Sequence, residues 1–280
     1  MLVGSPRVFD RADDLMRPVM DGEVGMERKT SGESGLARAL RIIEAFTSEQ
    51  TTLTVAEIAR RADLPVSTTY RLVGEMLSHG VLTKAEDGYV LGMRLWELAT
   101  RGSKTVGLSR AARPYIEDLQ HTFGQHAQLA VLEGTDVLYV DRRSAERGAV
   151  VNIIDVASRL PARLSSSGMV LAAYADYVTQ RRILSSPVEQ LTANTPIEPE
   201  RLKLLWAEIR RQGFCRADGW MEDDVSSVAS PVRDMSGVVA AVSLFLPNDG
   251  KAPRAAIPAV QMAAAGISRA LGWRPSQHPR

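Results

Sequence analysis

The sequence predicts an α+β protein with an N-terminal winged helix-turn-helix domain and a C-terminal domain built on a largely antiparallel sheet. Three observations lead to this prediction. Residues 54–78 show two short helical patterns joined by a tight turn, residues 81–91 show a hairpin pattern, and the remaining chain interleaves hairpins with helices. A chain of 280 residues is long enough for two domains. The expected limits are a disordered tail at 1–33, the winged domain at 34–92, a linker helix at 93–112, the second domain at 113–273 and a tail at 274–280.

Composition excludes several classes of protein. Hydrophobic residues make up 45% and charged residues 24% of the chain, and the formal net charge is only +1, which is typical of an ordinary globular protein. Cys215 is the single cysteine, so an intrachain disulfide and a cysteine-rich zinc site are both excluded. No apolar run approaches the roughly 18 residues of a membrane span. Residues 1–25 mix charges throughout, unlike a signal peptide, so we expect a cytoplasmic protein that starts at Met1 or Met26.

The helix-turn-helix is predicted from start and stop signals. Thr54 and Glu57 have the spacing of a capping box, in which each side chain accepts a hydrogen bond from the backbone N–H of the other residue. Pro65 ends the first helix, because the residue before a proline disfavours the α conformation. The second helix is expected to run from near Ser67 to Ser78.

This second helix is expected to have two different faces. Four residues with helical spacing should face inward, namely Tyr70, Val73, Met76 and Leu77. Four others lie on the opposite side, namely Ser67, Thr68, Arg71 and Glu75. Hydroxyls at a helix start, followed one turn later by an arginine, suit a helix in the major groove of DNA. A helical hairpin inside another kind of domain is the alternative. Because residues 34–95 carry seven basic and seven acidic side chains, attraction for DNA must come from local placement of charge.

Two further patterns complete the winged domain. Residues 35–47 form an amphipathic pattern that predicts a bracing helix, with the expected buried stripe Leu36, Leu40, Ile43 and Phe46. Residues 81–84 and 89–91 are β-prone and enclose an Asp-Gly turn, which is typical of a hairpin. Three helices followed by a hairpin make a winged helix-turn-helix. After it, residues 93–101 are expected to be helical, Gly102 to Gly107 to form a linker, and Ser109 to Phe123 to form another helix.

The second domain is expected to mix hairpins and helices. The predicted strands are 127–132 with 137–141, 150–156, a strand beginning near Phe214, and 228–232 with 238–246. The predicted helices are 165–174, 175–184, 199–212 and 255–271, with Gly213 ending the third of them. This order predicts an antiparallel sheet with helices packed against it.

From Gly35 to Leu271 the sequence resembles the IclR family of bacterial transcriptional regulators. The first domain contributes these motifs to the resemblance: 36–46 (LARALRIIEAF), 53–59 (LTVAEIA), Leu64-Pro65, 67–72 (STTYRL) and 89–92 (YVLG). The second contributes 111–114 (AARP), Leu160-Pro161, 165–168 (SSSG), Gly213-Phe214, 229–232 (ASPV) with Asp234, and 240–243 (AAVS). The resemblance implies a winged DNA-binding domain, a linker helix used in dimerisation, and a GAF-like effector-binding domain. It also implies a homodimer or homotetramer on a palindromic operator in double-stranded DNA.

The resemblance also implies roles for particular residues. The expected DNA contacts are Ser67, Thr68, Thr69 and Arg71 on the recognition helix and Lys84 on the wing. The expected effector contacts are Leu160, Ser166, Ser167, Asp218, Val225, Ser227 and Ser243, with Ile154 and Phe245 in the apolar wall. The chain departs from the family where Ser227 replaces a common Cys, Met169 a common Lys and Phe245 a small polar residue. The expected dimer interface consists of Leu95, Trp96, Leu98, Tyr115, Ile116 and Leu119.

Several of these residues also have a purely structural interpretation. Ser165 to Gly168 is either an ordinary helix N-cap or an anion-binding helix start. Ser227 and Ser243 either bond the backbone or face a ligand. An enzyme is not expected, because the chain has no Gly-x-Ser-x-Gly elbow and no glycine-rich phosphate loop. His121 and His126 are five residues apart, which puts them on different faces of a helix, and no acidic cluster completes a metal site, so no metal is expected. No cofactor is expected either.

The sequence therefore predicts a cytoplasmic regulator that responds to a small organic acid or aromatic effector. A repressor is expected because the family contains more repressors than activators. An activator, or a sensing module without DNA binding, is the alternative. No membrane partner is expected.

Overall fold

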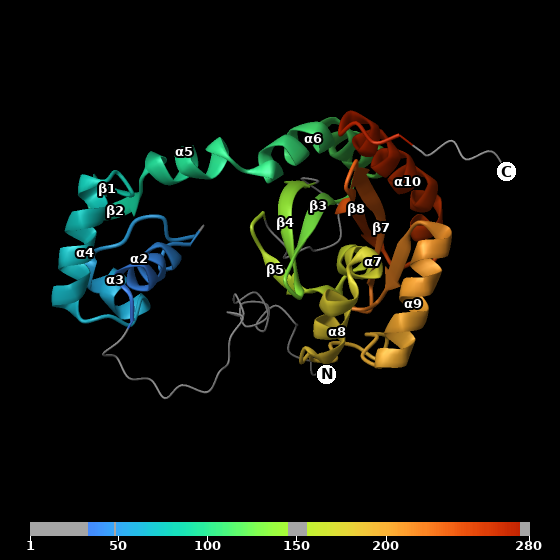
Figure 1. Cartoon of the computed structure of the whole chain (residues 1–280), viewed down its shortest axis with the longest axis horizontal. Helices are drawn as coiled ribbons and strands as arrows, with labels where there is room; N and C mark the ends of the chain where they lie inside the picture. The colour runs from blue at the N-terminus through green and yellow to red at the C-terminus, as the bar shows by residue number, and fades with distance from the viewer. Residues whose placement is uncertain (1–32, 48, 145–155, 275–280) are drawn as a thin grey trace, which may run out of the picture. The chain divides into compact units, whose positions relative to one another are not determined.

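The computed structural model in Figure 1 describes residues 33–47, 49–144 and 156–274. Outside these residues lie Met26, Ile154, both predicted tails except Glu33 and Arg274, and nearly all of the strand predicted at 150–156. The chain divides into two compact units between Val106 and Gly107. Within the described parts, we find no helix that is both long enough and apolar enough to cross a membrane.

The first unit is the expected winged helix-turn-helix. Its helices are α2 (Gly35–Glu44), α3 (Val55–Arg61), α4 (Val66–Ser78) and α5 (Met93–Arg101), and its strands are β1 (Leu82–Ala85) and β2 (Gly88–Leu91). The capping box at the start of α3 is confirmed: Glu57 N–H donates to Thr54 Oγ1 at 3.3 Å, and Thr54 N–H donates to Glu57 Oε2 at 2.8 Å. The antiparallel hairpin is confirmed as well, and Leu53 adds a bridge to Tyr89 on its outer side.

The core of this unit corrects three burial predictions. Leu36 and Leu40 are 71% and 48% exposed, because Ile42 on α2 and Ala45 just after it make the buried contacts instead. Tyr70 is 69% exposed, because the neighbouring Thr69 occupies the inward position of that helical turn. The residues that fill this core are Ile42, Ala45, Leu53, Ile58, Ala62, Leu72, Val73, Met76 and Leu82.

The segment between the two units is more helical than predicted. Helix α6 spans Lys104–Phe123, so only Gly102 and Ser103 separate it from α5. The predicted six-residue linker is wrong because Gly107 lies inside the helix, where a glycine is tolerated at a modest cost. Ile116 and Leu119 are buried in the core of the second unit, so they do not form the dimer interface predicted for them.

The second unit confirms the α+β prediction. Its sheet has the strand order β5-β4-β3-β8-β7-β6, and every pair of neighbours is antiparallel. The strands are β3 (Ala127–Glu133), β4 (Asp136–Arg143), β5 (Arg159–Pro161), β6 (Cys215–Asp218), β7 (Val225–Asp234) and β8 (Gly237–Pro247). The two predicted hairpins pair as β3 with β4 and β7 with β8. Strand β5 is too short to have shown a pattern in the sequence.

Helices cover both faces of this sheet (Figure 1). Helix α6 and the closing helix α10 (Ala252–Ala270) pack on one face and enclose the core around Leu129, Val228 and Val242. The other face is covered by α7 (Ser166–Tyr174), α8 (Tyr177–Ser185) and α9 (Pro199–Gln212). The predicted helices are thereby confirmed, including the end of α9 at Gly213, whose φ is 79°. The short 3-10 turn η1 (Ala162–Leu164) leads from β5 into α7.

Candidate functional site

The outward face of α4 carries the predicted DNA-contacting residues. Ser67 and Arg71 are exposed and Thr68 is partly exposed, so these side chains are available to a partner. Thr69 is not: it is fully buried, and its hydroxyl donates to the backbone oxygen of Pro65 at 3.1 Å. The structure therefore contradicts the prediction that Thr69 contacts DNA. The error arose because Thr69 was assigned by motif, whereas the helical turn places it against the core.

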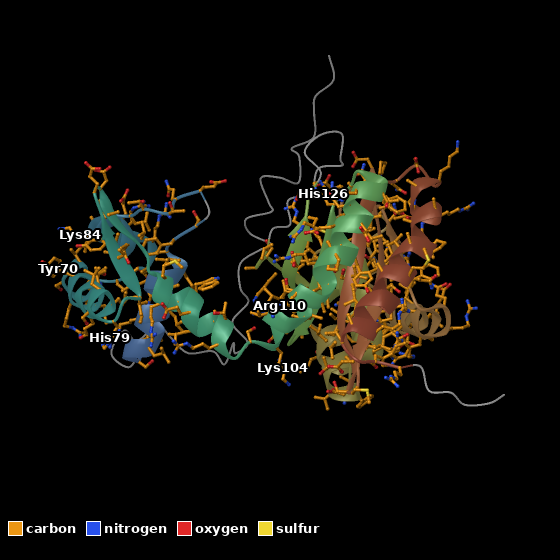
Figure 2. All side chains as sticks on the ribbon, turned by 90° about the horizontal axis from the view of Figure 1, so that it is seen from above. Tyr70, His79, Lys84, Lys104, Arg110 and His126 are labelled. Carbon is orange, nitrogen blue, oxygen red and sulfur yellow. The ribbon has the colours of Figure 1, made fainter. Side chains whose placement is uncertain are left out.

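Arg71 is already paired within the helix. Its Nη1 donates to Glu75 Oε1 one turn further on, and both side chains are 58% exposed. An ion pair this exposed contributes little, at most about 1 kcal/mol, so DNA can replace it readily. Lys84 projects from β1 on the wing and is exposed. In the view of Figure 2, Tyr70 and Lys84 lie at the same edge of this unit.

A second candidate site lies where α7 begins, on the face of the sheet that α7, α8 and α9 cover. Ser165 is the N-cap, and its hydroxyl accepts from the backbone N–H of Gly168 at 3.0 Å. A Cβ on Gly168 would lie 2.2 Å from the backbone oxygen of Ala162, so only glycine fits this approach of α7 to η1. Ser166 and Ser167 follow the cap and are each 1% exposed. The sequence left an ordinary N-cap and an effector-binding helix start as alternatives. The N-cap is present, and the case for an effector site depends on the hydroxyls beside it.

Buried hydroxyls from the sheet face these serines. Ser227 Oγ hydrogen-bonds Ser166 Oγ at 2.8 Å, which brings together two residues 61 positions apart. Ser243 on β8 is fully buried and lies on the same face of the sheet. In the described structure the hydroxyl of Ser243 has no hydrogen-bond partner, and the phenol of Tyr139 has only the hydroxyls of Ser165 and Ser167 beside it. We call Ser166, Ser167, Ser227, Ser243 and Tyr139 the hydroxyl cluster.

Tyr139 is a member of this cluster that the sequence analysis missed. Burial raises the pKa of its phenol to about 12, and the hydroxyls of Ser165 and Ser167 partly oppose that rise. The phenol is therefore neutral near pH 7 and able to donate a hydrogen bond. The alternation of β4 could have placed Tyr139 on the inner face, but no motif singled it out.

A small cavity adjoins the cluster. It measures about 20 Å³ and is lined by Leu164, Ser165, Ala217, Trp220, Met221, Val225, Ser226, Ser227 and Phe245. That volume holds one water molecule, not an organic ligand. Val225, Ser227 and Phe245 were expected here, whereas Trp220 and Met221 were not. None of the residues that line the cavity is Lys or Arg. Met169, which stands where the family often has Lys, is fully buried.

Two other predicted effector residues, Leu160 and Asp218, are not among the residues that line this cavity. Leu160 on β5 is 1% exposed and belongs to the apolar core under α7. Asp218 pairs with Ser226 in the ladder, one position after the Ala217–Ser227 pair, so its carboxylate points to the opposite face from Ser227. There it accepts hydrogen bonds from Arg216 Nε at 2.7 Å and from Ser226 Oγ. The prediction of Asp218 as an effector contact is therefore contradicted.

Strand β4 links the hydroxyl cluster to helix α6. Tyr139 pairs with Ala130 and Asp141 pairs with Leu129, so Val140 is an extra residue that forms a β-bulge. Because of the bulge, Tyr139 faces α7 whereas Asp141 faces α6.

The carboxylate of Asp141, which is 5% exposed, is held on the α6 side of the sheet. It accepts hydrogen bonds from Ser109 Oγ on α6 and from Arg143 Nη1 at 2.8 Å. Arg143 Nε in turn donates to Glu117 of α6 at 3.0 Å. Strand β4 therefore contributes to the hydroxyl cluster on one face of the sheet and is hydrogen-bonded to α6 on the other.

The described residues contain no group of His, Cys, Asp and Glu side chains arranged to hold a metal ion. His121 is exposed and His126 is buried.

Comparison with known proteins matches both units. The C-terminal domain model of the bacterial transcriptional regulator IclR matches residues 102–269, and the IclR helix-turn-helix domain model matches residues 35–86. A crystal structure of an IclR homolog complexed with 4-hydroxybenzoate, from Microbacterium hydrocarbonoxydans, is 40% identical with a TM-score of 0.80. The match covers 85% of this chain and 99% of that one.

Two further relatives extend the comparison. An IclR homolog from Microbacterium sp. strain HM58-2 is 37% identical, with a TM-score of 0.55, and the match covers 87% of this chain and all of that one. The Pca regulon regulatory protein of Pseudomonas putida is 29% identical over 222 residues, which are 79% of this chain and 76% of the relative.

Proposed function

Because the chain belongs to the IclR family of bacterial transcriptional regulators, we propose that it responds to a small aromatic acid, or a related organic acid, bound at the start of α7. Family membership makes the chain a DNA-binding transcriptional regulator and not an enzyme. The effector, its site and the sign of regulation are our proposal. We expect the protein to act in the cytoplasm, where its DNA is.

The observation that carries the proposal is the hydroxyl cluster. The Ser243 hydroxyl is buried without a partner in the described structure, and the buried phenol of Tyr139 has only the hydroxyls of Ser165 and Ser167 beside it. A buried polar group left unpaired costs about 1–3 kcal/mol, so native proteins keep such groups where a ligand or an ordered water completes them. Hydroxyl donors at the start of a helix, where backbone N–H groups are also free, suit a carboxylate.

The cluster and the cavity wall together favour an aromatic ring with polar groups. Trp220 and Phe245 offer aromatic surfaces, and the neutral phenol of Tyr139 can pair with a ligand hydroxyl or carboxylate. The structure from M. hydrocarbonoxydans contains 4-hydroxybenzoate, which is a ligand of this chemistry. Because no Lys or Arg lines the cavity, hydrogen bonds must hold the acid, and neutral relatives such as an amide should also bind.

Binding requires the cavity to widen. Ligand sites commonly measure about 300–1,000 Å³, far more than the 20 Å³ found beside the cluster. The wall at Trp220 is held by hydrogen bonds from Thr195 Oγ1 to the Trp220 oxygen at 2.6 Å and from Thr192 Oγ1 at 3.5 Å. A ligand that selects a wider arrangement would shift the population of the effector unit, and α6 would pass this shift to the DNA-binding unit.

We propose that the regulator is a repressor of genes for the breakdown of such an acid, which the acid releases from a palindromic operator. An activator with the same site remains the alternative. A gel-shift assay with the DNA upstream of the protein's own gene tests DNA binding and the effect of the acid on it. We expect a shifted band, and its loss when 4-hydroxybenzoate is added.

Two controls sharpen the assay. Thermal unfolding should show a higher melting temperature with 4-hydroxybenzoate, since a ligand that binds only the native state stabilises it. Tyr139→Phe should reduce that rise, whereas Tyr89→Phe on the wing should leave it unchanged. A ligand that raises the melting temperature and strengthens the band would favour an activator. No rise with any of a panel of aromatic and aliphatic acids would contradict the proposed effector class.

A further inference from the structure

The outward face of α4 has an apolar flank that its DNA-binding role has not yet explained. Val66 and Tyr70 are 59% and 69% exposed, and they are one helical turn apart. Residues spaced by four lie side by side on a helix, so the two side chains form one apolar strip. The ion pair between Arg71 and Glu75 lies beside this strip on the same face. On a helix that enters the major groove, this strip is placed to contact an apolar group of the DNA.

Gly74 extends the exposed strip by one helical turn. It follows Tyr70 by one turn on the exposed face, and a Cβ added to it would meet nothing within 4 Å. Glycine in a helix interior is less stable than alanine, but it lets another surface approach the backbone closely. The open space at Gly74 leaves room for such a surface, and for a recognition helix the partner is DNA.

We propose that Val66 and Tyr70 recognise thymine methyl groups in the operator and that Gly74 lets α4 lie in contact with the wall of the major groove. This inference rests on the DNA-binding function and adds which bases the chain selects. The thymine methyl is the one apolar feature on the base edges of the major groove, and aliphatic and aromatic side chains pack against it. The strip thus selects thymine on one flank of α4, while Arg71 contacts guanine or phosphate on the other.

The first experiment removes the methyl groups from the DNA. The full-length protein selects its operator from a random duplex library, and its affinity is measured by fluorescence anisotropy. Thymines in the half-site are then replaced one at a time by uracil, which removes only the methyl group. Each contacted methyl should contribute about fourfold in affinity, the equivalent of burying one methyl-sized apolar group.

Variants assign each methyl to its side chain. Val66→Ala should bind the thymine operator more weakly and should no longer distinguish thymine from uracil at one position. Tyr70→Ala should behave in the same way at a neighbouring position. Tyr70→Phe should keep the discrimination, because the ring and not the phenol hydroxyl makes the contact. Equal affinity of the wild type for all the uracil operators would overturn the proposal. Loss of affinity in Tyr70→Phe alone, without a methyl effect, would instead indicate a phosphate contact and would also overturn it.

Gly74→Ala tests the close approach with two opposed readouts. Its melting temperature should rise, because alanine is the better helix former, while its affinity for the operator should fall severalfold. Gly107→Ala is the matched control, since Gly107 also lies inside a helix and a Cβ added to it also meets nothing within 4 Å, but it belongs to α6. It should keep the wild-type affinity. Wild-type affinity in Gly74→Ala would contradict the close approach. Failure of the wild type to select any DNA would contradict DNA recognition itself, a result distinct from all of these.

Discussion

Ser227 shows how one hydroxyl can serve both the fold and a ligand. Its bond to Ser166 joins β7 to the start of α7 across the buried face of the sheet. Ser227→Val keeps the volume and removes the hydroxyl, so we expect effector binding to weaken by about 1–3 kcal/mol, the cost of leaving its partner unpaired. Affinity for DNA without effector should not change. Calorimetric titration with 4-hydroxybenzoate measures the difference.

Ser230→Val is the matched control for that experiment. Ser230 is also a buried serine of β7, but it lies on the opposite face and donates to the Gly213 oxygen at 2.7 Å. The control should lose stability without losing effector affinity. If both variants bind the effector as the wild type does, the ligand lies elsewhere. If Ser227→Val also fails to bind DNA, its role is structural.

Arg71 and Lys84 should affect DNA binding in different ways. If Arg71 contacts a base, Arg71→Ala should cost about 1–3 kcal/mol and relax specificity at one position of the operator. Lys84 on the wing is placed for a phosphate, so Lys84→Ala should weaken binding to all sequences equally and reduce the salt dependence by about one unit of slope. Titrations against operator and random DNA at several salt concentrations separate the two. Unchanged affinity for both kinds of DNA would remove the residue from the interface.

Sequence reasoning at this scale found the residues that motifs mark and missed those that only packing marks. Ser166, Ser167 and Ser227 come together at one helix start, as the motifs suggested. Tyr139 was missed because its role depends on which face of β4 it occupies. Thr69 and Asp218 were assigned wrongly for the same reason: each lies within a motif, but the turn of the helix or the pleat of the strand points it away.

At the scale of elements, the bulged strand β4 is the best candidate for a connection between effector and DNA. Asp141→Asn removes the charge that holds Arg143 and weakens the tie to Ser109 of α6. We expect this variant to bind effector and DNA separately but to show a smaller change in DNA affinity when effector is added. The measured quantity is the ratio of DNA affinities with and without effector, which is the coupling between the two sites.

Asp218→Asn provides the control for this prediction. Asp218 also pairs with an arginine, Arg216, but it lies on β6, and its described hydrogen bonds come from Arg216 and Ser226 and not from α6. Its substitution should leave the ratio of DNA affinities unchanged. A wild-type ratio in Asp141→Asn would show that the signal travels by another route.

The element boundaries themselves were predicted well where a local signal exists. The start of α3 at its capping box and the end of α9 at Gly213 follow from one or two residues, and the Asp-Gly signal placed the wing turn to within one residue of its position at Glu86-Asp87. The start of α6 was missed because the glycines at 102 and 107 suggested a linker. Strand β5 was missed because three residues are too few to show an alternating hydrophobic pattern. The bulge at Val140 leaves no trace in the sequence, since it depends on the pairing of two strands.

At the scale of the whole molecule, the exposed apolar residues of α5 predict a second copy of the chain. None of the nine residues of α5 is buried against the described chain, yet Met93 and Trp96 are 69% and 63% exposed. Large exposed aromatic residues are more frequent in protein interfaces than on the rest of the surface, and tryptophan is among the residues that contribute most binding energy there. A dimer related by a two-fold axis would present two copies of α4 to half-sites about 34–36 Å apart, as a palindromic operator requires.

If this dimer forms as proposed, Trp96→Lys should convert it into a monomer and weaken operator binding, because one recognition helix alone contacts only one half-site. Light scattering at micromolar concentration gives the molecular mass, and anisotropy gives the affinity for whole and half operators. Met235→Lys changes an even more exposed apolar side chain, 82% exposed in the turn after β7, and should alter neither measurement. A wild-type protein that is monomeric at these concentrations and still binds its operator tightly would contradict the two-fold arrangement. A Trp96→Lys variant that stays dimeric would place the interface on other residues.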